Sequence, residues 1–170
     1  MQHKTHNLAY AALIAALYAV LTHLQNFILP NSASMAIQLR LSEALCVLSF
    51  FTPAAIPGLT IGCLLFNMTF AAALPLDWLV GTAATLTATS AMYALRRVRI
   101  WNYPLPGMVM PALTNAILVG WELSIYVGGG FWLNALYVAL GELIVLLVLG
   151  TVVLRAFEKR NLAKRLFPEF

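Results

Sequence analysis

Long apolar runs, almost free of charged side chains, are the feature that most restricts how this chain can fold. The stretch from Leu41 to Leu74 contains one charged residue, Glu43. Of the 170 residues, 62% are apolar and 9% carry a formal charge. A soluble domain has about 25% charged residues, because its surface must be hydrated. We therefore expect most of this chain to lie in lipid.

The length of the chain limits how often it can cross a membrane. One crossing needs about 20 apolar residues, so six helices would use roughly 120 residues and leave about 50 for turns and tails. The runs are too long and unbroken for the alternating strands of an outer-membrane barrel, which are about 10 residues each. The sequence predicts an all-α integral membrane protein: one domain over residues 1–170, folded as a bundle of six transmembrane helices.

Prolines and glycines divide the apolar runs. The stretch from Leu41 to Leu74 is too long for one crossing, and Pro53 and Pro57 with Gly58 supply a break. Asn7 is a suitable N-cap for the first helix. The predicted helices cover residues 7–27, 41–53, 56–74, 78–95, 106–126 and 131–157.

Basic residues predict the orientation. Nine of the ten Lys and Arg residues would fall on one side of a six-helix bundle, and only Arg40 on the other. By the positive-inside rule, both termini are expected in the cytoplasm of a bacterial cell, with the bundle in its cytoplasmic membrane. The net charge of +4 is therefore no sign of nucleic-acid binding. The nine residues are Lys4, Arg96, Arg97, Arg99, Arg155, Lys159, Arg160, Lys164 and Arg165.

Motifs for catalysis are absent from the sequence. No lysine occurs between residues 5 and 158, which excludes a GxxxxGK[ST] phosphate loop there, and neither HExxH nor GxSxG is present. Cys46 and Cys63 lie inside apolar runs, so neither a disulfide nor a metal site is indicated. We expect no enzyme, no cofactor and no metal. An ATPase that powers transport would have to be another protein.

Polar side chains within the predicted helices are the candidate binding residues. An ionisable group in a membrane helix costs ~2.5–3.5 kcal/mol on insertion scales, so each one requires an explanation. Most of them fall in the outer half of the bundle, together with Trp and Tyr. This pattern predicts an outward-facing pocket for a polar, aromatic small molecule that is rich in hydrogen-bond donors. The candidates are Arg40, Glu43, Asn67, Trp78, Trp121, Glu122, Tyr126, Asn134, Tyr137 and Glu142.

Structural roles remain open for most of these residues. The Trp and Tyr side chains also suit an aromatic belt at the membrane surface. Arg40 and Glu43, three residues apart, could form a salt bridge that pins the preceding loop. Asn67 and Asn115 could join helices by hydrogen bonds. For Glu122 and Glu142 a bound ligand or a proton is the more natural partner, since Arg40 is the only intramembrane cation.

Two alanine stripes mark the first helix: Ala11, Ala15 and Ala19, and Ala12 with Ala16. Small residues four positions apart allow two helices to approach closely in lipid. The stripes therefore indicate either packing within the chain or a docking face for a separate membrane protein.

Two segments carry a family resemblance that extends over nearly the whole chain. The stretch ALIAALYAVLT, from Ala12 to Thr22, resembles the first helix of S components, the substrate-binding subunits of energy-coupling factor (ECF) transporters. The stretches QLRLSEALCVL, from 38 to 48, and FFTPAAIPGLTIGCLLFN, from 50 to 67, are similar to the queuosine-precursor transporter (QueT) family.

The resemblance implies capture of a 7-deazaguanine base, such as queuine or its aminomethyl precursor, from outside the cell. It also implies an energising module of one membrane coupling protein and two ATPases, on which the S component topples to deliver its substrate. Ala12 and Ala16 match the motif that packs on the coupling protein. A carboxylate suits the paired donors of a guanine edge, and stacking of the ring on Trp or Tyr is worth ~1–3 kcal/mol.

Other functions fit the same residues. One is an S component for a different vitamin or nucleobase. Another is a proton-coupled carrier of aromatic cations, in which Glu122 or Glu142 exchanges protons. A third is a membrane assembly subunit without transport activity.

Overall fold

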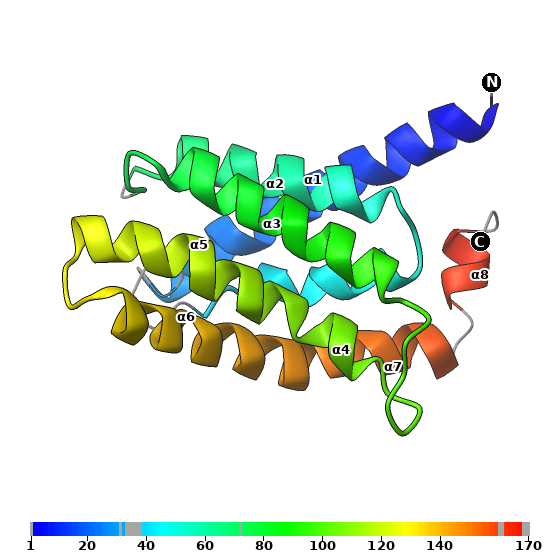
Figure 1. Cartoon of the computed structure of the whole chain (residues 1–170). Helices are drawn as coiled ribbons and strands as arrows, with labels where there is room; N and C mark the ends of the chain where they lie inside the picture. Colours follow the sequence, from blue (N-terminus) through cyan, green and yellow to red (C-terminus); the bar gives the residue numbers. More distant parts are fainter. Residues whose placement is uncertain (1, 31, 33–38, 72, 160–161, 168–170) are drawn as a thin grey trace.

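Long helices lie side by side in the structure, a computed structural model (Figure 1). The described residues are all except 1, 31, 33–38, 72, 160–161 and 168–170, so Arg160 of the basic cluster lies outside them. Among the described residues the only extended pairing is one bridge between Ile100 and Tyr103. The prediction of an all-α fold is therefore confirmed. The main helices are α1 (Gln2–Ile28), α2 (Ala55–Thr69), α3 (Asp77–Ala94), α5 (Met110–Tyr126) and α6 (Phe131–Val145).

The distribution of polar and apolar side chains is that of a membrane protein. Three helical stretches are long and apolar enough to cross a bilayer: Thr5–Ile28, Leu105–Tyr126 and Phe131–Lys159. They expose large apolar side chains, among them Val20 on α1 and Ile117 on α5. Four of the six acidic residues of the chain are instead buried. In water, apolar side chains would be buried and acidic ones exposed, so this arrangement is the one expected of a surface in lipid. A count of six crossings remains a prediction.

The second predicted helix, 41–53, differs from expectation. Residues Leu41–Phe50 form a 3₁₀ helix, η1, that ends before Pro53. Side chains three residues apart eclipse one another in a 3₁₀ helix, because it has three residues per turn. Glu43, Cys46 and Ser49 therefore lie in one row, and all three are buried.

Glycines on α2 bring it close to α1. A Cβ atom built on Gly58 would lie 2.8 Å from the carbonyl oxygen of Ala11, and one on Gly62 would lie 2.8 Å from that of Ala15. Ala11 and Ala15 are both buried in this contact. Only small residues on both helices permit so short a separation, as is common between helices in lipid.

Several helix ends differ from the predicted ones. The first helix begins at Gln2, so Asn7 is not its N-cap but lies within it. The helix predicted at 56–74 ends at Thr69, because the chain turns there and the Asp77 carboxylate accepts the N–H of Leu74 at 2.6 Å. The predicted 78–95 helix begins one residue earlier, at Asp77.

The fifth and sixth predicted helices are each interrupted. A short helix, α4 (Leu105–Met108), precedes α5, and Val109 separates the two. Pro111 follows at the start of α5, where its missing N–H costs least. After α6 comes a π-helical turn, η2 (Leu146–Gly150), then α7 (Thr151–Lys159) and a separate α8 (Leu162–Leu166).

Both termini and the connection between α3 and α4 lie at the same end of the bundle (Figure 1). The connections from α2 to α3 and from α5 to α6 lie at the opposite end. The described basic residues of the three clusters therefore share one end. Which side of the membrane this end faces remains a prediction.

Candidate functional site

The candidate site is a group of charged side chains inside the bundle, centred on Arg40. Its guanidinium carbon lies 5.7 Å from the centre of the Phe66 ring, close enough for a cation–π interaction. Electrostatic interactions connect Arg40 to four carboxyl groups from four different elements. Among the described buried residues, Arg40 is the only cation. The four carboxyl groups belong to Glu43 on η1, Asp77 on α3, Glu122 on α5 and Glu142 on α6.

Glu43 is held by hydrogen bonds within the protein. The hydroxyl of Tyr18 on α1 donates to its Oε1, and the thiol of Cys46 donates to its Oε2 at 3.0 Å. Nearby, Thr22 donates to the hydroxyl of Ser42 at 2.6 Å. The hydrogen bonds of Tyr18 and Thr22 both join α1 to η1. The Glu43 carboxylate therefore has a structural role in attaching η1 to α1.

Gln25 fixes the segment before η1. Its amide group donates to the carbonyl of Leu39 and, at 2.9 Å, to the hydroxyl of Ser32. Its Oε1 accepts the N–H of Leu41 at 2.8 Å. The backbone on both sides of Arg40 is thereby attached to α1, which positions the guanidinium inside the bundle.

Glu122 differs from Glu43 in its hydrogen bonding. It is fully buried, and neither of its carboxyl oxygens has a hydrogen-bond donor among the described residues. Asp77 is an acidic neighbour that interacts electrostatically with it, and a second negative charge nearby makes an ionised Glu122 still less favourable. A buried carboxylate without a donor is costly. Glu122 therefore needs a proton or a ligand.

Glu142 is partly satisfied. The side-chain amide of Asn115 donates to its Oε1 at 2.7 Å, which joins α5 to α6. Its Oε2 is buried, and no described residue forms a hydrogen bond with it. The predicted role of Asn115 in joining helices is thus borne out by this contact, and one acceptor of Glu142 remains available.

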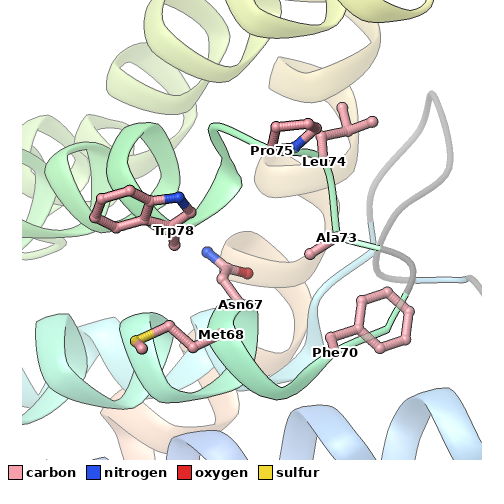
Figure 2. A pocket seen from close by; sticks show the side chains of 7 residues that line it. All are labelled: Asn67, Met68, Phe70, Ala73, Leu74, Pro75 and Trp78. Atoms are coloured by element: carbon pink, nitrogen blue, oxygen red, sulfur yellow. The ribbon is translucent and has the colours of Figure 1, made fainter.

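Asn67 lies at the wall of a cavity near the end of α2 (Figure 2). Its amide nitrogen donates to the carbonyl of Asp77 at 2.8 Å, and its Oδ1 is buried and has no partner among the residues that the structure describes. The side chains of Phe70 and Trp78 lie on either side of it (Figure 2). This cavity of about 410 Å³ is open to the outside and is lined by Asn67, Met68, Phe70, Ala73, Leu74, Pro75 and Trp78.

Other predicted site residues are not brought into this group. The amide of Asn134 donates to the carbonyls of Gly128 and Gly130, so it holds the turn between α5 and α6 instead of facing a ligand. Trp121 and Tyr126 are exposed on α5, and Tyr137 is half-buried on α6. Exposed rings near a helix end fit the alternative role in an aromatic belt.

The two alanine stripes of α1 have different surroundings. Ala11 and Ala15 are buried against α2, so they are not available to another protein. Ala12 and Ala16 are exposed, and Ala19 is half-buried. Of the five alanines predicted to face a partner, only Ala12 and Ala16 lie fully on the outer surface.

Sequence reasoning missed part of this group. Tyr18 and Gln25 were not candidates, although with Thr22 they recur at a helical spacing on an otherwise apolar helix, a polar face that could have indicated them. Asp77 was not among the predicted site residues either, and only the fold brings its carboxyl group near Glu122.

The chemistry of the group is that of a binding site for a hydrogen-bond donor. Four buried carboxyl groups accompany one buried guanidinium among the described residues, which leaves an excess of negative charge when they are ionised. Among the described residues no three His, Cys, Asp or Glu side chains could hold a metal ion. The unpartnered oxygens of Glu122, Glu142 and Asn67 are all acceptors. A compact ligand with several N–H groups or a positive charge is the complementary partner.

Comparison with known proteins gives one match. The family model described as QueT transporter matches residues 8–159, which includes every helix of this group. Neither the curated proteins nor the solved structures give a significant match.

Proposed function

We propose, from the premise that this chain belongs to the QueT transporter family, that it is the substrate-binding S component of an ATP-driven ECF importer. Membership of this family makes the chain a transporter in the membrane. In the proposal it captures a 7-deazaguanine queuosine precursor outside a bacterial cell. It then delivers the precursor inward by reorienting on an energising module, without changing it chemically.

One observation carries the substrate proposal: buried acceptors without donors. The two oxygens of Glu122 and the Oε2 of Glu142 have no hydrogen-bond partner in the described part of the chain, although both residues are at most 3% exposed. A guanine-type edge presents two parallel N–H donors that match one carboxylate. The aminomethyl precursor adds a cationic amine for a second carboxylate. The excess of carboxylates over Arg40 favours that precursor over a neutral base.

The proposed partner surface is the exposed stripe of Ala12 and Ala16. Their small side chains leave an exposed strip of α1 smooth, next to the strip of Ala11 and Ala15 that packs on α2, which suits close packing of a second membrane protein. The coupling protein of the energising module is the proposed occupant. Both termini are proposed to face the cytoplasm, where the ATPases would be.

A binding titration of the purified protein tests the substrate. Queuine, its aminomethyl precursor, guanine and two vitamins are titrated against the same preparation by calorimetry. We expect the deazaguanines to bind and the aminomethyl precursor to bind tightest, while the vitamins produce no heat. Saturable binding of a vitamin alone would replace this proposal with an S component of another specificity.

A second function, a proton-coupled carrier of aromatic cations, is favoured by the buried Glu122 carboxyl group, whose two oxygens have no donor among the described residues. A proton would remove the cost of the buried charge, and a bound cation could displace that proton. Uptake in proteoliposomes separates the two functions. If an imposed proton gradient drives uptake when no ATPase is present, the carrier is correct and the ECF assignment is wrong.

A further inference from the structure

The connection between α3 and α4 carries a strained tryptophan. Ile100 and Tyr103 exchange two backbone hydrogen bonds, of 2.8 and 2.9 Å, which close a two-residue turn. Within the turn Trp101 has φ of 48° and Asn102 has φ of 60°. Such turns require positive φ at both positions. Asn adopts this conformation readily, but a bulky residue such as Trp rarely does.

Packing within the protein does not explain the strain. The Trp101 side chain is 97% exposed, the most exposed of the large apolar residues in the described chain. Val98 and Ile100, on the same connection, are 46% and 44% exposed. Because packing of the side chain does not explain the strained backbone of Trp101, the strain indicates that the indole binds something outside the protein.

The turn is nevertheless firmly attached. The hydroxyl groups of Tyr103 and Thr151 on α7 are 2.5 Å apart. Arg99 forms an ion pair of 2.8 Å with Glu158 on α7 and also donates to the carbonyl of Asn102 at 3.3 Å. Contacts on both sides of Trp101 thus fix the turn on α7, so the indole is presented from a rigid base.

The position of the connection indicates its surroundings. It projects sideways from the end of the bundle beside α7, across the direction of the helices (Figure 1). A group that projects sideways from the end of a transmembrane bundle lies at the depth of the lipid headgroups. Trp prefers this depth, because its ring is apolar and its N–H needs a polar partner.

Basic side chains accompany the indole. Arg97 and Arg99 are exposed on the same connection, and Arg96 stacks on the Tyr93 ring at 3.9 Å. Anionic phospholipid headgroups attract such residues near a membrane surface. We propose that residues 97–103 form an anchor that binds the anionic headgroup layer at this end of the bundle, with Trp101 inserted among the headgroups.

Single-tryptophan fluorescence in vesicles tests the anchor. The chain has four tryptophans, so replacing Trp78, Trp121 and Trp132 by Phe leaves Trp101 as the only one. The variant is reconstituted without any partner protein into phosphatidylcholine vesicles, with and without phosphatidylglycerol. We expect emission at shorter wavelength than that of N-acetyltryptophanamide and several-fold weaker quenching by aqueous iodide. Headgroup nitroxide lipids should quench it more strongly than nitroxides deep in the acyl chains.

Two further variants isolate the role of charge. In the variant that keeps only Trp101, phosphatidylglycerol should further protect Trp101 from quenching by iodide. Adding Arg97→Gln to this variant should reduce that protection. A matched variant that keeps only Trp132, which is 83% exposed at the start of α6, should show no such dependence. Emission and iodide quenching of Trp101 equal to those of the free compound in both lipid mixtures would overturn the proposal. Shielding that develops only when a coupling protein is added would also overturn it, and would assign the turn to a protein partner.

Discussion

Buried polar residues in this protein differ in whether the fold supplies them with partners. Glu43 and Asn134 have theirs from neighbouring elements, whereas Glu122 has none. A buried acceptor without a donor is costly, so the residues that lack partners are the ones that a ligand would stabilise. This difference separates side chains that hold helices together from side chains that await a ligand.

Replacing Glu122 by Gln should weaken substrate binding without loss of stability. A hydrogen bond to a charged group contributes ~1.5–3 kcal/mol, so we expect roughly 10- to 150-fold weaker binding. Glutamine turns one acceptor into a donor that opposes a guanine-type edge. Removing the buried charge should leave the thermal midpoint equal or higher. Calorimetric titration and thermal unfolding measure the two effects.

Glu158→Gln is the matched control, because Glu158 lies at the opposite end from the Asn67 cavity and pairs with Arg99. It should bind substrate as the parent does. Parent-like binding by Glu122→Gln would remove Glu122 from the site, while the family assignment would stand.

Tyr18→Phe should lower stability, because it removes the hydrogen bond between α1 and the Glu43 carboxylate. Leaving a buried acceptor without its donor costs ~1–3 kcal/mol. Thermal unfolding in detergent measures the change. Tyr10→Phe keeps the edge-to-face contact of its ring with Phe167 and serves as control. An unchanged midpoint for Tyr18→Phe would mean that η1 is not held by this bond.

At the scale of elements, the contact between α1 and α2 depends on the absence of side chains. In Gly62→Ala the new Cβ would lie 2.7 Å from the Cβ of Tyr18 and 2.8 Å from the Ala15 carbonyl. Helix backbones must separate to relieve such contacts, which costs ~1–3 kcal/mol. We expect a lower thermal midpoint, whereas Ile61→Ala on the lipid side should change it little. Equal midpoints would contradict the close packing.

The outer face of α1 gives the complementary prediction. Ala12→Leu adds bulk at an exposed position of α1, so folding and substrate binding should be near normal. Transport with the energising module should be blocked, because the added side chain separates the proposed partner helices. Uptake assays with co-expressed module and a binding titration make the comparison. Loss of binding together with transport would show that this face serves the pocket instead.

At the scale of the whole molecule, orientation is open to a direct labelling test. Cysteines introduced in place of Val127, between α5 and α6, and Val98, between α3 and α4, lie at opposite ends on exposed positions. The native Cys46 and Cys63 are fully buried and should not be labelled. In intact cells an impermeant maleimide should label residue 127 only. The reverse pattern would place the termini outside.

The resemblance read from the central segments is confirmed, and so is the all-α fold. The hydropathy of a segment is the sum of the free energies of transfer of its residues from water to lipid, so it follows from the sequence alone. Multi-pass membrane character could therefore be predicted without any contact. The conformation of η1 and the end of α2 at Thr69 could not, since both depend on side chains packed from elsewhere.

By itself the sequence determined the class of protein: long apolar helices in lipid, few charged residues and the segments typical of one transporter family. Only the tertiary structure decided which alanines remain exposed and which carboxylates lack donors. The stripes of Ala11 and Ala12 have the same composition, and Glu43 and Glu122 have the same side chain. They differ in the partners brought to them from distant segments, and pairing between distant residues is a property of the fold rather than of local composition.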